Sequence, residues 1–193
     1  MKHIGLDIGS FFRHKNISSI FTLCGGHISP ILVGCEKENI DIIQVRDEAS
    51  AVFAADAVSR LTESIGVAIV TAGPGVTNTI TAIKNAQMAQ SPLLLIGGAA
   101  ATLLKGRGSL QDIDQISLLK TYVKSAVSVK KTRDVIPTLG NAINTAISGV
   151  PGPVFIELPI DLLYPENDIR TEHMNQLPKN GLFGKIARWY VNR

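Results

Sequence analysis

The chain has 193 residues, 45% of them hydrophobic, and a formal net charge of +3 at pH 7. This length and apolar content favour one compact domain with a real core and exclude a disordered chain. The basic residues are scattered rather than grouped in blocks, which argues against a nucleic-acid-binding protein.

In chain order, short apolar runs alternate with longer helical stretches. The runs that predict strands are 19–23, 41–45, 67–71, 93–96, 125–129 and 154–157. The stretches that predict helices are 29–38, 48–63, 76–90, 112–120 and 134–148. Strict alternation with short connections predicts an α/β fold, a doubly wound parallel sheet with helices on both faces. Several strands lack polar alternation, as expected when both faces of a sheet are covered.

Composition divides the chain into three segments. Residues 1–18 are an N-terminal segment, residues 19–164 are the main domain, and residues 165–193 are a linker with the start of a further domain. Prolines and charges without a period indicate the linker, and residues 181–190 favour another helix. Residues 4–10 have the glycines of an actin-like phosphate loop, but no β-hairpin pattern follows, so this interpretation is disfavoured.

Cysteines and histidines give no sign of a metal site. Cys24 and Cys35 have no metal-ligand spacing, and the four histidines are dispersed, so no metal ligand is predicted in this chain. The thiols are expected to be reduced and buried, as in an intracellular protein. Residues 1–12 lack the apolar core of a signal peptide, and the longest apolar run, 92–104, is too short for a membrane helix. The chain alone is therefore predicted to be soluble and cytoplasmic.

A carboxylate stands at the end of the second predicted strand. Glu48 follows the apolar run 42–45 and begins the predicted helix 48–63. Open α/β sheets bind ligands beyond the carboxyl ends of their strands, so Glu48 is a candidate functional residue. A simpler interpretation is a glutamate in the first helical turn that is stabilised by the helix dipole.

A glycine-rich loop, 71–78, follows the third predicted strand. Its Gly73-Pro74-Gly75 segment lacks the third glycine of a dinucleotide-binding fingerprint, and the chain has no Gly-Lys-Ser/Thr of a Walker loop. Glycines here still allow a backbone to approach a flat ligand closely. Taken alone, however, the segment is best interpreted as a simple tight turn.

Two further loops carry candidate residues. Gly25, Gly26 and His27 follow the first predicted strand, where the simpler interpretation is a turn with a polar surface histidine. Gln111 precedes a predicted helix, where the simpler interpretation is a helix-entry residue beside an N-cap.

Five segments taken in order change these interpretations, because together they resemble thiamine-diphosphate enzymes of the acetohydroxyacid synthase group. Residues 21–30 are similar to the first glycine loop of that family. Arg46-Asp47-Glu48-Ala49 resembles its catalytic Arg-His-Glu segment, with Asp47 in the histidine position. The other three segments resemble its Gly-Pro-Gly loop, its Phe-Gln-Glu segment and its closing Pro-Gly-Pro-Val segment: 71–78, 110–114 and 152–159. The resemblance covers residues 19–164.

The resemblance implies the pyrimidine-binding domain of a thiamine-diphosphate enzyme. The carboxylate of Glu48 would hydrogen-bond N1′ of the cofactor aminopyrimidine and so activate the cofactor. The other residues expected at the cofactor are Gly73, Pro74, Gly75 and Asn78. The residues expected on the substrate side are Gly25, Gly26, His27 and Gln111. Residues 25–30, 85–92 and 157–161 look most like the acetolactate synthase-like branch that is also described as 2-hydroxyacyl-CoA lyases. Such enzymes cleave a 2-hydroxyacyl-CoA between C1 and C2 to give a shortened aldehyde and formyl-CoA.

The resemblance also implies parts that this chain does not supply. The family binds Mg²⁺ and the diphosphate through a Gly-Asp-Gly motif in a separate domain, and the chain contains no Gly-Asp-Gly. The active site would form in a homo-oligomer or with a chain that carries the diphosphate domain, and the substrate would be a 2-keto acid or a 2-hydroxyacyl-CoA. FAD is not expected, because Val150 and Ile160 replace the family's arginine and lysine.

The chain alone is thus predicted to be inactive, as a fragment, a truncated gene product or one subunit of a split enzyme. The resemblance is compatible with full-length eukaryotic relatives that are anchored in the endoplasmic-reticulum membrane. Two other hypotheses stay open: a non-catalytic domain that dimerises with or regulates full-length relatives, and an unrelated flavodoxin-like nucleotide-binding domain. A Gly-Asp-Gly segment in the same or the next reading frame would favour the enzyme.

Overall fold

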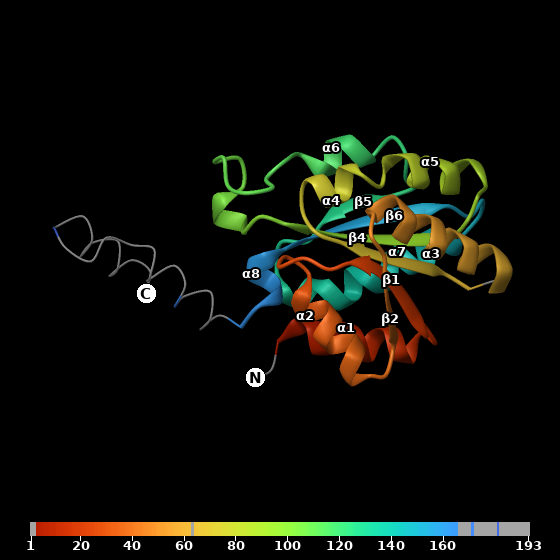
Figure 1. The fold of residues 1–193 in the computed structure, drawn as a ribbon, viewed down its shortest axis with the longest axis horizontal. Helices are drawn as coiled ribbons and strands as arrows, with labels where there is room; N and C mark the ends of the chain where they lie inside the picture. The colour runs from red at the N-terminus through yellow and green to blue at the C-terminus, as the bar shows by residue number, and fades with distance from the viewer. Residues whose placement is uncertain (1–2, 63, 166–170, 172–180, 182–193) are drawn as a thin grey trace.

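The structure is a computed structural model that describes residues 3–62, 64–165, 171 and 181. In this part of the chain, six strands form one sheet in the order β2-β1-β3-β4-β6-β5, and every neighbouring pair is parallel (Figure 1). The strands are β1 (Ser19–Leu23), β2 (Asp41–Gln44), β3 (Gly66–Val70), β4 (Leu93–Ala99), β5 (Ala126–Ser128) and β6 (Pro153–Pro159). The predicted doubly wound α/β fold is confirmed.

Helices cover both faces of the sheet (Figure 1). One face carries α1 (Ile4–His14), α2 (Ser29–Lys37), α7 (Val135–Ile147) and α8 (Ile160–Leu163). The other carries α3 (Glu48–Thr62), α5 (Ile80–Met88) and α6 (Gln115–Leu119). Alternate strand residues face opposite cores, as Ile20 and Phe21 do on β1. The short helices α4 (Pro74–Thr77), η1 (Thr102–Leu104) and η2 (Thr132–Asp134) lie in the connections.

The first helix packs closely on α2. A Cβ added to Gly5 would lie 1.9 Å from the carbonyl oxygen of Pro30, and one added to Gly9 would lie 2.2 Å from that of Gly34. Ile8 and Phe12 on the same helix are fully buried in the core. The glycines of residues 4–10 therefore serve helix packing, and the segment is an α-helix rather than the phosphate loop that its glycines resemble.

Two predicted helices differ from the structure by more than one residue at an end. The predicted helix 76–90 is divided into α4 and α5, and at the break the hydroxyl of Thr79 donates to the carbonyl of Val76 at 2.6 Å. The predicted helix 112–120 begins only at Gln115. Gln111 has a positive φ of 61°, and Asp114 caps α6 by accepting from the backbone N–H of Ser117 at 3.0 Å.

Strand β4 extends three residues beyond its predicted end, through Gly97 and Gly98, because it pairs with β6 along its whole length. The predicted linker at 165–193 and the predicted helix at 181–190 lie almost wholly outside the described residues. None of the helices among the described residues has the length and apolar character needed to cross a bilayer.

Candidate functional site

The candidate site lies where the order of the strands reverses. From β1 the chain passes to β2 on one side and then to β3 on the other, so β1 and β3 are neighbours that lead into helices on opposite faces. Ligands of open α/β sheets bind at such a switch point, beyond the carboxyl ends of the strands. The loops that follow β1, β2 and β3 all emerge at this edge, and they carry most of the residues that the sequence singled out.

Glu48 is the first residue of α3 and is 7% exposed. Its Oε2 accepts a hydrogen bond of 2.9 Å from Nδ2 of Asn78. Its Oε1 lies 3.5 Å from the place where a Cβ of Gly75 would stand. The N-cap of the helix is instead Asp47, whose Oδ1 accepts from the N–H groups of Ala49 and Ser50 at 2.8 and 3.3 Å. Asp47 therefore caps the helix, and the carboxylate of Glu48 is directed to the loop after β3.

The loop after β3 has a backbone that requires glycine at Gly73. Its φ is 62° and its ψ is −112°, and a Cβ there would lie 2.7 Å from the carbonyl oxygen of Gln111. The structure thus brings two predicted residues, Gly73 and Gln111, into backbone contact although they come from different loops. Pro74 follows as an exposed first residue of α4, and Gly75 is buried.

The loop after β1 contacts the same region through Thr71. A Cβ added to Gly25 would lie 2.6 Å from Oγ1 of Thr71, and Nδ1 of His27 lies 3.4 Å from that hydroxyl. Partial burial lowers the pKa of His27 below its usual 6.5, which favours the neutral imidazole. Gly26 differs from its neighbours, because it is exposed and no heavy atom lies within 4 Å of the place of an added Cβ.

Sequence reasoning missed two buried polar residues beside the loop after β3. Gln115 accepts a hydrogen bond of 2.8 Å from the N–H of Gly73 and donates to Glu157 at 2.7 Å. Glu157 is fully buried at the carboxyl end of β6. One signal was available in the sequence, since a single carboxylate within an otherwise apolar strand needs partners when it is buried.

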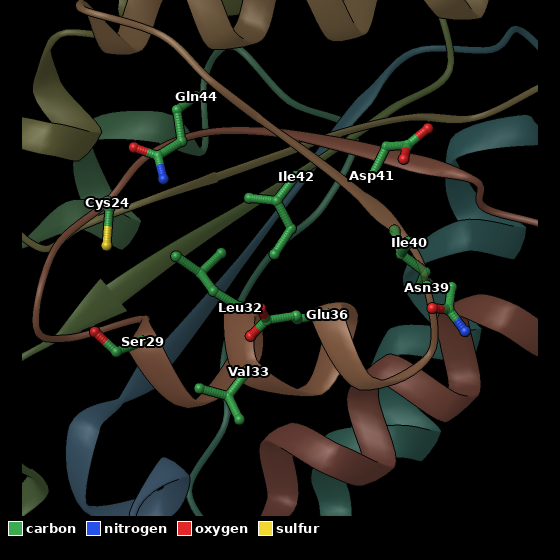
Figure 2. A pocket seen from close by; sticks show the side chains of 10 residues that line it. All are labelled: Cys24, Ser29, Leu32, Val33, Glu36, Asn39, Ile40, Asp41, Ile42 and Gln44. Carbon is green, nitrogen blue, oxygen red and sulfur yellow. The ribbon is translucent and has the colours of Figure 1, made fainter.

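A separate hollow of about 600 Å³ lies between α2 and β2 (Figure 2). Side chains of α2 such as Leu32 and Glu36, and side chains of β2 such as Ile42 and Gln44, point into it. Its ten lining residues include none of the residues predicted to contact a cofactor. Glu48 and Asn78 do not line this hollow, so it is separate from the candidate site at the loops after β1, β2 and β3.

Metal ligands do not gather in the described part of the chain. Of the two cysteines expected to be buried, Cys35 is buried and Cys24 is exposed, because Cys24 follows the end of β1. Among residues 3–62, 64–165, 171 and 181, no group of three or more His, Cys, Asp or Glu side chains is placed to hold a metal ion.

Comparison with known proteins gives a consistent set of relatives. A family model described as "Thiamine pyrophosphate enzyme, N-terminal TPP binding domain" matches residues 8–118. The chain is 58% identical over 190 residues to "2-hydroxyacyl-CoA lyase 2" of Danio rerio, and 53% identical over 191 residues to the protein of the same name in Homo sapiens. It is 38% identical over 159 residues to "Acetolactate synthase large subunit IlvG" of Mycobacterium tuberculosis.

These matches include most of this chain but only a part of each relative. They cover 98%, 99% and 82% of the chain in the same order, but 31%, 30% and 29% of the three relatives. The chain therefore spans about 30% of the length of the curated relatives it matches, so those proteins contain further domains.

Proposed function

The chain belongs to the thiamine pyrophosphate enzyme family through its N-terminal TPP-binding domain, and we propose that it forms the pyrimidine side of a thiamine-diphosphate-dependent enzyme that breaks or forms C–C bonds. The observation that carries this proposal is the placement of Glu48. A buried carboxylate at the switch point of the sheet, beside a glycine loop, is suited to bind a flat heterocycle.

The residues present fit an aminopyrimidine ring. Gly75 adjoins the Glu48 carboxylate without a side chain that would crowd it, since a Cβ there would lie 3.5 Å from Oε1 of Glu48 and 2.8 Å from Cγ2 of Thr71. Oε2 is held by Asn78, which leaves Oε1 as the oxygen to meet a ring nitrogen. The residues that would hold the ring are Glu48, Gly73, Pro74, Gly75 and Asn78.

Glu48 would act as the acid–base group for the cofactor. Its carboxyl would hold a proton at N1′ of the aminopyrimidine and exchange it as the ring changes its protonation state. When bound, thiamine diphosphate supplies the carbanion chemistry that amino-acid side chains cannot perform. Asn78 would orient the carboxylate, and burial beneath the glycine loop would exclude water from it.

The names of the relatives support one choice of substrate class. Relatives named 2-hydroxyacyl-CoA lyase 2 are 53% and 58% identical to the chain, against 38% for the acetolactate synthase. We therefore favour cleavage of a 2-hydroxyacyl-CoA between C1 and C2 to an aldehyde and formyl-CoA, and the alternative is acetolactate formation from a 2-keto acid. His27 and Gln111 are the side chains that we expect on the substrate side.

The remaining parts of the site would come from outside the described residues. Mg²⁺ and the diphosphate would be held by a diphosphate-binding domain, in another copy of the chain or in a partner chain. The described residues that line the candidate site contain no metal-binding cluster of their own.

Two experiments test this function. Calorimetric titration of the isolated chain with thiamine diphosphate and Mg²⁺ should give weak binding, and tight binding would show that the diphosphate anchor lies within this chain. A complete enzyme that contains this domain should convert a 2-hydroxyacyl-CoA to aldehyde and formyl-CoA. Absence of product from 2-hydroxyacyl-CoA and from pyruvate, together with stable association with a full-length relative, would favour the non-catalytic, regulatory domain instead.

A further inference from the structure

The side-chain amide of Gln115 is buried and makes three hydrogen bonds. The residue is 1% exposed. Its Oε1 accepts from the N–H of Gly73 at 2.8 Å, and its Nε2 donates to the carbonyl of Gly98 at 3.1 Å and to Oε2 of Glu157 at 2.7 Å. These contacts use both amide hydrogens and the amide oxygen, so the group connects the loop after β3 to β4 and β6.

The orientation of that amide is determined by its partners. A backbone N–H requires the oxygen of Gln115 on one side, while a carbonyl and a carboxylate require its nitrogen on the other. Glutamate at position 115 would offer two acceptors and repel Glu157, and leucine would leave the N–H of Gly73 without a partner. This position therefore needs an amide, which a purely apolar packing role would not require.

Glu157 accepts a hydrogen bond from Gln115 and is itself held by two further residues. Its side chain is fully buried, and its Oε1 accepts from the hydroxyl of Ser128 at 2.7 Å and pairs with the ammonium of Lys105. A charged acceptor polarises the Gln115 amide and strengthens its bond to Gly73. Lys105 lies in the segment between β4 and α6, which also carries Gln111.

Gly73 is the point at which this network meets the candidate site. It begins the loop whose next residues are Pro74 and Gly75, and Asn78 at the end of α4 holds Glu48. Its φ of 62° is one of several conformations that glycine adopts readily, and a specific hydrogen bond to its N–H helps to select it. A shift at Gly73 would move Gly75 and Asn78 relative to the carboxylate.

We propose that Gln115, supported by Glu157, is a positioning residue that sets the cofactor loop against Glu48. The expected effect on cofactor binding and turnover rests on the proposed function. The expected effect on the conformation of the loop at Gly73 does not. The alternative is that the network only stabilises the fold, as other buried polar groups do.

The first test measures amide hydrogen exchange at Gly73 by NMR in the full chain without cofactor. Gln115→Met keeps the length of the side chain and removes its hydrogen bonds, and it should lower protection at Gly73 by about 10–100-fold. Ser59→Ala is the matched control, because Ser59 is also buried and donates to the carbonyl of Pro92 at 2.8 Å, at the opposite edge of the sheet. It should reduce stability without selective loss at Gly73.

A rescue variant keeps the proposal testable if Gln115→Met does not fold. The double variant Gln115→Glu with Glu157→Gln exchanges the amide and the carboxylate, so residue 115 can still accept from Gly73 and from residue 157 but no longer donates to the carbonyl of Gly98. Protection at Gly73 should therefore lie between that of Gln115→Met and that of wild type. A folded double variant with an unprotected Gly73, or a Gln115→Met variant with normal protection there, would overturn the proposal.

The second test uses a complete enzyme that contains this domain and measures thiamine diphosphate binding and turnover. Gln115→Met should weaken cofactor binding or reduce turnover by about 10–100-fold, because small misplacements of catalytic groups are costly. Ser59→Ala should change neither quantity. If Gly73 loses protection while binding and turnover stay normal, the positioning role fails. If the wild-type enzyme binds no cofactor, the proposed function fails, and the exchange result still decides the geometric part.

Discussion

Asn78 donates a hydrogen bond of 2.9 Å to Glu48 and thereby joins the loop after β3 to the helix after β2. The two residues are 30 positions apart in the sequence. The carboxylate is therefore held by the same loop that is expected to line the cofactor, and its position depends on the conformation of that loop.

Loss of this hydrogen bond should impair the enzyme more than the fold. Asn78→Ala removes the side-chain donor from Glu48, and bonds to charged groups contribute about 1.5–3 kcal/mol, so turnover of a complete enzyme should fall about 10–100-fold. Asn144→Ala is the control, because Asn144 is exposed on α7, on the opposite face of the sheet. Equal turnover of the two variants in a steady-state assay would show that Asn78 does not orient the carboxylate.

The conformation of Gly73 should make its substitution destabilising. An alanine there would adopt a φ of 62° and contact the backbone of Gln111. We expect a loss of about 2–3 kcal/mol, because strained backbone costs about 1–3 kcal/mol and the contact adds to it. For a chain of this size that corresponds to a fall in Tm of roughly 4–12 °C.

Gly26→Ala provides the comparison for Gly73→Ala in the same calorimetric or fluorescence melt. No heavy atom lies within 4 Å of a Cβ at Gly26, so its Tm should stay within about 2 °C of wild type. Similar Tm values for the two variants would mean that the loop after β3 adapts to a side chain.

The fold was largely predictable because strands buried on both faces leave a clear apolar signal. Runs such as 93–96 and 154–157 alternate with helical stretches, and this pattern alone indicates a parallel sheet. The bounds of α4 and α6 were not predictable, because they depend on the hydroxyl of Thr79 and on the positive φ of Gln111. Neither feature has a periodic signature in the sequence.

The site was predictable only in part, for a related reason. Glu48 and the loop 71–78 follow strands, so their common edge can be inferred from topology. The roles of Gln115 and Glu157 come from contacts across 42 residues of sequence, and no local pattern encodes those contacts. The assignment of cofactor and substrate residues stays a prediction, which the variants described here test.

Stability should depend on pH through His27. Burial lowers the pKa of this imidazole below 6.5 in the folded state, so the unfolded chain binds more protons in that range. The free energy of unfolding should therefore be highest above about pH 6.5 and fall as the pH decreases toward the folded-state pKa. Urea denaturation between pH 8 and pH 5 measures this slope of the free energy of unfolding against pH.

His27→Asn should reduce that slope and leave stability above pH 7.5 nearly unchanged. Some slope should persist, because burial also lowers the pKa of His3. An identical slope in wild type and His27→Asn would indicate that the environment of His27 does not favour the neutral form.

The last prediction concerns Glu48 itself. Glu48→Gln keeps the shape of the side chain and a hydrogen-bonding group, but it cannot exchange a proton with the pyrimidine nitrogen. General acid–base groups contribute about 10²–10⁴-fold, so turnover of a complete enzyme should fall by about that factor. Stability should barely change, because the substitution makes no cavity and removes the charge of a residue that is only 7% exposed. Turnover number and Tm should be measured on the same preparation.

Asp47→Asn is the matched control for Glu48→Gln, since it neutralises the adjacent carboxylate. Asparagine caps a helix about as well as aspartate, so the bonds to Ala49 and Ser50 should persist and Tm should change little. Turnover should also stay within a few-fold of wild type, because Asp47 is exposed and its carboxylate caps α3. If Glu48 were only a first-turn residue, its substitution would cost a few tenths of a kcal/mol of dipole interaction and the two variants would behave alike. Near-normal turnover of a folded Glu48→Gln enzyme would therefore assign the cofactor chemistry to another group.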